Sequence, residues 1–217
     1  KMVKPASCAP ENDDADYLKY DIGGPYWTCQ SDGEAVLQFA KKGFASVKEV
    51  PQTTLPAIFV DACKEKGDKI AMRTENLLKW SKGDPIPEPR QLDAWKSWTY
   101  NEFHDQVRAC AKAMIELGFK RHDSANIFGF NSPEWFIAAY AAMFAGGKAA
   151  GIYPSDNEEQ VQFKSNHSNG SVAFVENEEC LRKFTAIVDD LPYLRVVVCW
   201  ACKPPKSRKI ERSNGGK

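Results

Sequence analysis

The sequence predicts an α/β fold in which helices cover both faces of a mainly parallel sheet. From residue 124 onward, short apolar runs alternate with helical patterns in the order strand, helix, strand, repeated three times. The expected strands are apolar along their whole length, which is typical of strands buried on both faces of a parallel sheet. No sequence repeat of fixed period accompanies this alternation.

Four strands and three helices are expected in this half. The strands are Ala125–Phe130, Ala149–Tyr153, Ser171–Val175 and Arg195–Trp200. Ser132 as N-cap and Pro133 in the first turn begin a helix that runs through Phe144 and ends at Gly146-Gly147. Asp156 with Glu159 opens a helix to about His167, and Asn177 caps a helix through about Asp189.

The first half is less regular. A short hairpin is expected from Trp27-Thr28 to Val36-Leu37-Gln38-Phe39, around the turn dipeptide Asp32-Gly33. Pro51–Lys66 is predicted to be a helix, with Pro56 in its first turn and an apolar stripe. The members of that stripe are Leu55, Ile58, Phe59 and Ala62. Strands at Ile70–Arg73 and Ala94–Trp98 flank the Pro-rich surface loop Ser81–Arg90.

A second amphipathic helix is expected to start at Thr99. Thr99 can cap it, and Glu102 three residues later completes a capping box that satisfies two free backbone N–H groups. The apolar stripe that follows consists of Phe103, Val107, Cys110, Ala111, Met114 and Leu117. Gly118 supplies a left-handed end to the helix.

We therefore expect three regions. Residues 1–50 form a polar leader with the short hairpin, 51–202 form the α/β domain, and 203–217 form a basic flexible tail. The tail has six Lys and Arg residues against one Glu, and it contains Pro-Pro and Gly-Gly pairs. A solvated linker is the expected interpretation of this tail, and a nucleic-acid-binding tail is the alternative.

Composition excludes several protein classes. The chain has 217 residues, 29 Lys and Arg against 29 Asp and Glu, and no apolar run long enough for a membrane span. Zero net charge gives no overall electrostatic reason to bind nucleic acid. Seven irregularly spaced Cys residues and no visible secretory signal favour reduced thiols in the cytoplasm. We expect a cytoplasmic protein, with peripheral contact to a membrane left open and the oligomeric state unknown.

No complete active site is visible from residue types and spacing. Cys199 and Cys202 have metal or redox spacing, but Pro204-Pro205 prevents a helix from beginning there and no second Cys pair exists. Gly146-Gly147-Lys148 lacks the first Gly and the Ser or Thr of a phosphate loop. We therefore predict no catalytic, cofactor-binding or metal-binding residue, and a reduced thiol pair at the strand end.

Two stretches resemble core motifs of adenylate-forming enzymes. Trp98–Phe103, which contains Thr, Tyr and Glu, resembles the first motif. Met143–Gly147, continuing to Tyr153–Asp156, resembles the second, in which a helix ends at Ala-Gly and a strand leads to a Pro-containing turn. The run Ile127–Tyr153 is most similar to the bubblegum-like branch of long-chain fatty acyl-CoA synthetases. The resemblance spans roughly residues 25–202.

The resemblance implies the early part of the large N-terminal domain of such an enzyme, where both motifs act as scaffold. It implies an ATP-dependent fatty acid–CoA ligase that forms an acyl-adenylate and then an acyl-CoA, using ATP, magnesium and CoA. In that family a Ser/Thr/Gly-rich loop ending in Pro-Lys binds the phosphates, and this sequence has no such loop. We therefore expect an inactive fragment of a ligase. The alternative is a non-catalytic binding or interaction module with the same partial fold.

Overall fold

The computed structural model describes residues 27–29, 35–37, 53–75 and 88–202. The chain divides into two units, 1–54 and 55–217, which are described separately. In the first unit, β1 (Trp27–Cys29) pairs antiparallel with β2 (Ala35–Leu37), which confirms the predicted hairpin. Its turn, the rest of the leader, most of the Pro-rich loop and the basic tail lie outside the described residues. The predicted boundaries at 50 and 202 stay predictions.

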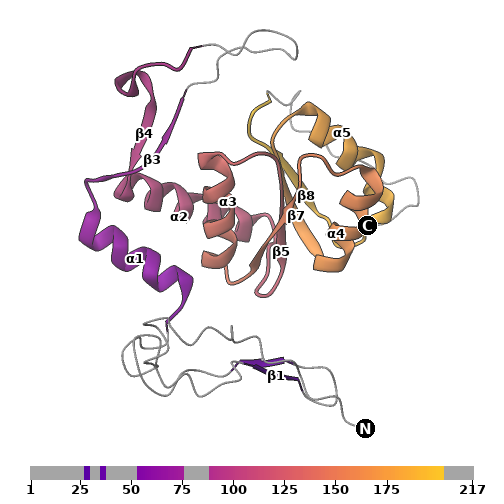
Figure 1. The fold of residues 1–217 in the computed structure, drawn as a ribbon. Coiled ribbons are helices and arrows are strands. Elements are labelled where there is room, and N and C mark those ends of the chain that lie inside the picture. Colours follow the sequence, from indigo (N-terminus) through magenta and orange to yellow (C-terminus); the bar gives the residue numbers. More distant parts are fainter. Residues whose placement is uncertain (1–26, 30–34, 38–52, 76–87, 203–217) are drawn as a thin grey trace, which may run out of the picture. The chain divides into compact units, whose positions relative to one another are not determined.

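A four-stranded parallel sheet forms the centre of the second unit (Figure 1). Its spatial order is β6-β5-β7-β8, and every neighbouring pair is parallel. The strands are β5 (Ser124–Phe128), β6 (Lys148–Ile152), β7 (Gly170–Val175) and β8 (Val196–Cys199). The α/β fold and the four predicted parallel strands are thereby confirmed.

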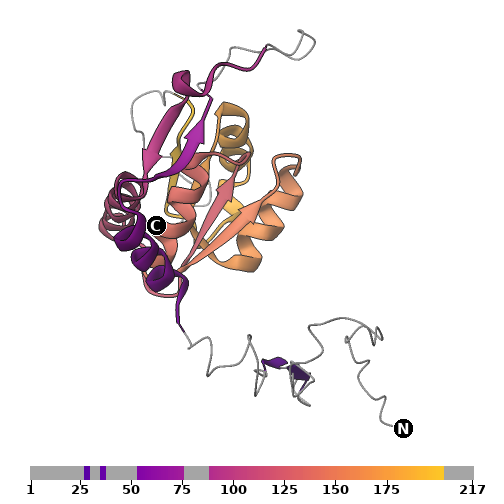
Figure 2. The ribbon, with the colours of Figure 1, turned by 60° about the vertical axis from the view of Figure 1, so that its left-hand side comes forward.

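Helices cover both faces of this sheet, as the apolar strands predicted (Figure 2). One face packs against α2 (Tyr100–Glu116) and α3 (Pro133–Phe144), whose buried side chains meet Ile127 and Phe174. The other packs against α4 (Glu158–Ser168) and α5 (Glu178–Ala186). The side chains of β5, β7 and β8 alternate between these two cores, so both faces of this part of the sheet are covered.

Local capping explains where most of these helices begin. Ser132 Oγ accepts a hydrogen bond from Trp135 N at 3.2 Å, and Asn177 Oδ1 accepts one from Cys180 N at 3.0 Å. Both were predicted. For α4 the prediction was wrong, because Asn157 is the N-cap and forms a capping box with Gln160. Asp156 instead lies one residue before that cap and is buried.

Two further predicted boundaries differ in the structure. Helix α5 ends at Ala186 and is followed by a separate 3-10 turn, Val188–Asp190, rather than continuing through Asp189. A 3-10 turn at Leu92–Ala94 likewise precedes β4 (Lys96–Thr99), which was predicted to begin at Ala94. Strand β4 pairs antiparallel with β3 (Ile70–Thr74).

Helix α1 (Leu55–Lys66) begins four residues later than predicted, and only part of the predicted apolar stripe is buried. Phe59 and Cys63 are its buried residues, whereas Leu55 and Ile58 are exposed. Phe59 lies against the rings of Phe103, at 4.9 Å, and Tyr140, at 4.5 Å. The helix rotates to place its aromatic side chain between α2 and α3, which helical spacing alone does not specify.

The capping box of α2 is confirmed. Thr99 Oγ1 accepts from Glu102 N at 3.1 Å, and a Glu102 carboxylate oxygen accepts from Thr99 N at 2.8 Å. Gly118, just after this helix, has φ +93°, in the left-handed region that glycine adopts without strain. None of the described helices combines the length and apolar character needed to cross a bilayer.

Candidate functional site

The carboxyl ends of β5 and β7 form the point at which an open α/β sheet usually binds ligands. Strand β5 leads through α3 to β6 on one side, and β7 leads through α5 to β8 on the other. The two connections therefore diverge between two adjacent strands, and ligands in such folds occupy the crevice at their carboxyl ends. The residues at this point are Gly129 and Phe130 after β5, and Glu176 after β7.

Glu176 links the ends of β5, β7 and β8 by hydrogen bonds. Its backbone N donates to Phe128 O at 2.9 Å, and its carboxylate accepts from Phe130 N at 2.9 Å. Its backbone O accepts from Ala201 N at 2.9 Å, just after β8. One half-buried acidic side chain thus fixes the loop after β5, 46 residues away in sequence.

Trp200 fills the space beside this carboxylate. An added Cβ on Gly129 would lie 2.6 Å from the Cβ of Glu176 and 2.7 Å from a ring carbon of Trp200. Only a residue without a side chain fits between them. Glu176 and Trp200 therefore pack directly against Gly129 at the end of β5.

A second carboxylate holds the end of β6. The side chain of Asp156 is 7% exposed, accepts a hydrogen bond from Tyr153 N at 3.0 Å and forms an ion pair with Lys164. Lys183 Nζ donates to the backbone O of Asp156 at 2.8 Å. Lys164 Nζ also lies 4.6 Å from the ring centroid of Tyr153. A buried carboxylate needs such partners, because an unpaired charge away from water is strongly unfavourable.

The described residues at this edge do not fit the phosphates of ATP. Backbone N–H groups after the strands are the usual phosphate donors in open α/β sheets. Those of Phe130 and Tyr153 already donate to carboxylates, which repel a phosphate. Within the described ranges, no three His, Cys, Asp or Glu side chains are grouped so that they could share a metal ion. No step of adenylation follows from these residues.

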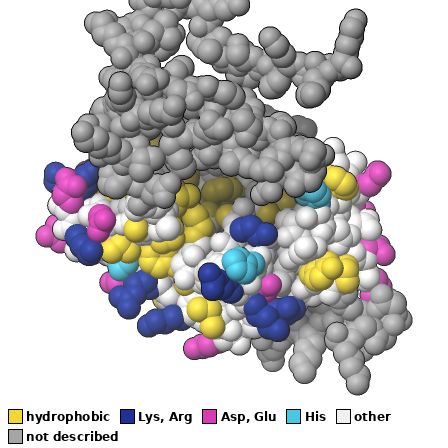
Figure 3. Space-filling model, turned by 90° about the horizontal axis from the view of Figure 1, so that it is seen from below, with side chains coloured by type: hydrophobic (Ala, Val, Ile, Leu, Met, Phe, Trp, Pro, Cys, Tyr) yellow, Lys and Arg dark blue, Asp and Glu magenta, His cyan; other side chains and the backbone are white. Residues whose placement is uncertain are grey.

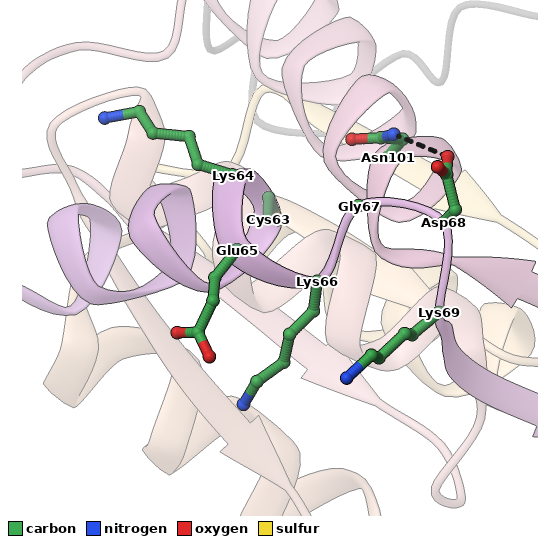
Figure 4. A pocket seen from close by; sticks show the side chains of 8 residues that line it. All are labelled: Cys63, Lys64, Glu65, Lys66, Gly67, Asp68, Lys69 and Asn101. Atoms are coloured by element: carbon green, nitrogen blue, oxygen red, sulfur yellow. Dashed lines mark hydrogen bonds between the residues drawn. The ribbon is translucent and has the colours of Figure 1, made fainter.

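A shallow depression of about 400 Å³ lies where α1 ends and α2 begins (Figure 4). It is lined by Cys63, Lys64, Glu65, Lys66, Gly67, Asp68, Lys69 and Asn101. Asn101 turns toward Asp68, and its Nδ2 donates to the carboxylate at 3.4 Å, while Lys66 and Lys69 point away from them. The charged groups do not converge on a common point, so the depression has the character of ordinary surface.

The two motif stretches form scaffold, as predicted. Trp98–Phe103 supplies the end of β4 and the capped start of α2. Gly146 has φ +83°, and an added Cβ on Gly147 would lie 2.4 Å from Asp123 O. The glycine pair therefore ends α3 and lets the chain pass close to the loop before β5, which agrees with helix closure rather than phosphate binding.

The structure joins Cys199, the last residue of β8, to Cys202 in a disulfide. The predicted reduced thiol pair is therefore wrong: the turn after Cys199 brings the two Cα atoms to 6.0 Å, within the range that a disulfide spans. Burial raises the pKa of the thiols of Cys63, Cys110 and Cys180, that of Cys110 to about 11. These three side chains are protonated at neutral pH, so none of them is a ready nucleophile.

Comparison with known proteins assigns the family. The model of the AMP-binding enzyme family matches residues 59–216, which include the sheet, its helices and both motif stretches. The chain belongs to the AMP-binding enzyme family. The resemblance read from the two motifs is thereby confirmed.

The curated relatives of this AMP-binding chain are long-chain-fatty-acid–CoA ligases. It is 31% identical to ACSBG2 of Xenopus laevis over 172 residues, which are 79% of this chain and 21% of that protein. It is 31% identical to human ACSBG1 over 179 residues, 82% of this chain and 22% of that protein. The chain thus spans about a fifth of the length of the relatives it matches. These relatives confirm the predicted resemblance to the bubblegum-like branch.

Solved structures share the fold. The anthranilate CoA ligase AuaEII, in complex with anthranoyl-AMP, superposes with a TM-score of 0.58 at 17% identity, covering 71% of this chain and 26% of that one. The long-chain-fatty-acid-CoA ligase FadD1 of Archaeoglobus fulgidus gives 0.56 at 15% identity, covering 71% and 28%. At these identities the likeness concerns the fold, and it agrees with the predicted N-terminal domain of an adenylate-forming enzyme.

Sequence reasoning missed the two carboxylates that hold the strand ends. Asp156 was interpreted as a helix opener, and Glu176 was not singled out. A usable signal was present, since each acidic residue follows shortly after a mostly apolar strand. The prediction that the chain has no catalytic, cofactor-binding or metal-binding residue is tested by no observation and stays a prediction.

Proposed function

We propose that this chain is the early part of the AMP-binding domain of a long-chain fatty acid–CoA ligase. The match of the family model over residues 59–216 is the observation that carries the proposal. The named activity of the curated relatives supports the substrate class, a long-chain fatty acid and CoA. In the proposed enzyme, the fatty acid and ATP, with magnesium, give an acyl-adenylate and pyrophosphate, and the CoA thiol then displaces AMP.

Within that enzyme the described residues serve as scaffold in this proposal. Glu176 and Asp156 hold the carboxyl ends of the strands, and Gly129 and Gly147 let neighbouring segments approach closely. Adenylation needs the substrate carboxylate held in line with the α-phosphate, and it needs cations or N–H groups at the developing charge. The N–H groups of Phe130 and Tyr153 are directed at carboxylates instead. The 217-residue chain alone is therefore expected to be inactive.

The second candidate function is a non-catalytic binding or interaction module. One observation favours it: Glu176 and Trp200 pack closely against Gly129, at the strand end where such folds usually bind ligands. A module that has lost catalysis has no need for an open crevice at that point. This candidate predicts a stable, soluble monomer of 217 residues.

Sequencing the transcript beyond the codon for Lys217 separates the two candidates. An open reading frame that encodes a Ser/Thr/Gly-rich loop ending in Pro-Lys supports the ligase. A stop codon directly after Lys217 supports the module, and a monomer with a sharp melting transition would strengthen that result.

An activity assay tests the ligase directly. The longer product, if encoded, should release pyrophosphate from ATP in the presence of magnesium only when palmitate is added, and the 217-residue chain should release none. Omission of palmitate is the matched control for ATP hydrolysis. Palmitate-dependent release by the 217-residue chain would overturn the fragment proposal, because it requires a complete active site within these residues.

A further inference from the structure

A disulfide joins the end of β8 to the turn that follows it, beside the candidate site. Cys199 is the last residue of the strand, and its Sγ is bonded to that of Cys202, three residues later. Neither side chain is fully buried, and Ala201 between them is exposed. A thiol from solution can therefore approach this bond, as thiol–disulfide exchange requires.

The charged side chains seen in Figure 3 do not offer a comparable chemical feature. On that face Lys and Arg side chains lie among acidic, hydrophobic and His side chains. Such a mixture is typical of ordinary protein surface, to which apolar as well as polar atoms contribute. A disulfide differs from it because the bond can be broken and formed again without loss of any residue.

The loop that this disulfide closes is too short for the bond to be a major stabiliser of the fold. A disulfide lowers the entropy of the unfolded chain, and this effect grows with the length of the closed loop. Only two residues separate Cys199 from Cys202. Small folds that depend on disulfides are dense in them, whereas Cys63, Cys110 and Cys180 are free thiols here. The bond therefore fits a reversible redox role better than a structural one.

The disulfide constrains the turn that carries Trp200. Trp200 N donates to Val175 O at 3.1 Å, and Ala201 N donates to Glu176 O at 2.9 Å. The ring of Trp200 packs against Gly129 and against the core next to α2 and α3. Gly129 follows β5, at the strand ends where open α/β sheets bind ligands. The bond therefore holds an aromatic side chain at the candidate site.

Cys202 is the sulfur that an external dithiol attacks, because Cys199 packs against the core next to α4 and α5. A thiolate of the dithiol forms a bond to Cys202 Sγ, the disulfide breaks, and Cys199 Sγ leaves with the electron pair and takes a proton. The second thiol then attacks the sulfur of the dithiol in this mixed disulfide. Cys202 Sγ leaves with the electron pair and takes a proton. The chain gains two electrons and two protons, and the dithiol is oxidised to a disulfide.

Reduction leaves the turn with fewer constraints. Cys199 Sγ lies 3.6 Å from Glu176 O, so the reduced thiol can donate a weak hydrogen bond there. The turn is then held by the backbone hydrogen bonds of Trp200 and Ala201 and by the packing of the Trp200 ring. Segments with few such contacts open locally at low free energy. Trp200 can therefore leave Gly129 more often while the sheet stays folded.

We propose that Cys199 and Cys202 form a reversible redox site, reduced by a dithiol, whose state controls how firmly Trp200 is held at the ends of β5 and β7. The pair is acted on and does not itself catalyse exchange in other proteins, because the described residues after β8 form a bend and not the helix start typical of catalytic pairs. The inference goes beyond the proposed ligase activity and does not depend on it, since both of its tests need no activity.

Alkylation of the 217-residue chain tests the redox chemistry. The chain is incubated in its native state with dithiothreitol or with glutathione disulfide, quenched with acid, and alkylated in denaturant. Mass spectrometry of the peptide that contains Cys199 and Cys202 should find two alkyl groups after dithiothreitol and none after glutathione disulfide. Exchange of one reagent for the other should reverse the result.

Hydrogen exchange in the two redox states tests the consequence for the turn. After reduction, the amide hydrogens of Trp200 and Ala201 should exchange roughly tenfold faster or more, because the turn opens more often. Exchange within β5 should not change. The double variant Cys199→Ser, Cys202→Ser should exchange at the fast rate with or without dithiothreitol. The matched control Cys110→Ser removes a thiol from α2 and should keep the difference between the two states.

Three results would overturn the proposal. The first is a chain that forms no bond between Cys199 and Cys202 in glutathione disulfide. The second is a bond that resists dithiothreitol until the chain unfolds, which would make it a structural disulfide. The third is equal hydrogen exchange of the turn in both redox states, which would show that the bond does not control Trp200.

Discussion

Gly170, at the start of β7, shows how a single residue can be fixed by a buried neighbour. An added Cβ there would lie 1.8 Å from Asn126 Oδ1. Asn126 is fully buried in the middle of β5, and its Nδ2 donates to Ser168 Oγ at 2.9 Å, so its side chain is held in place. We expect Gly170→Ala to lower the free energy of unfolding by about 1–3 kcal/mol through overpacking.

Gly151→Ala is the matched control for this residue-scale prediction. Its added Cβ would lie 3.5 Å from the ring of Trp135, an ordinary contact, so the change should stay within about 0.5 kcal/mol. Urea denaturation followed by circular dichroism measures both variants. Equal stability of the two variants would contradict the proposed collision with Asn126.

At the scale of elements, the start of α2 depends on one side chain. Thr99→Ala removes the hydroxyl that accepts from Glu102 N, and we expect a loss of about 1 kcal/mol in the free energy of unfolding. Thr99→Ser keeps the hydroxyl and should retain most of the stability. The denaturation midpoints of both variants are compared with that of the wild type. A Thr99→Ala variant as stable as the wild type would show that the cap does not stabilise the protein.

The orientation of α1 supplies a second test at this scale. Phe59→Ala removes a ring packed between α2 and α3 and should lower the free energy of unfolding by about 3–5 kcal/mol. Ile58→Ala, one residue earlier and 52% exposed, should change it by about 0.5 kcal/mol or less. Thermal and chemical denaturation compare the two. The reverse order of effects would contradict the burial of Phe59 between α2 and α3.

Elements whose signals are local could be predicted from the sequence, and features that depend on distant partners could not. The caps at Ser132 and Asn177 accept hydrogen bonds from N–H groups three residues further along the chain. The apolar strands directly indicate a sheet that is buried on both faces. The buried face of α1 depends on rings in α2 and α3, and Glu176 acts on a loop 46 residues away. Spacing along one element contains no information about such contacts, so the sequence predicted the helix but placed Leu55 and Ile58, which are exposed, on its buried stripe.

For the molecule as a whole, the sheet has open edges. In the described part of the chain β6 pairs with β5 alone and β8 with β7 alone. Residues Lys148, Ala149 and Gly151 of β6 are exposed. Unpaired N–H and C=O groups along such a strand provide a template for a second chain, and small side chains do little to obstruct its approach. Lys148 is the one charged side chain on this strand, and it lies at its end.

We therefore expect the isolated 217-residue chain to self-associate at micromolar concentrations, with strand β6 as the contact. Ala149→Lys places a charge in the middle of the exposed edge and should shift the chain toward the monomer of 24.3 kDa. Ala113→Lys adds the same charge at an exposed position of α2 and should leave the association unchanged, because that helix has no unpaired strand edge. Size-exclusion chromatography with light scattering measures all three proteins. A monomeric wild-type chain would contradict pairing through the edge and favour the stand-alone module, whereas equal effects of the two lysines would indicate general charge repulsion.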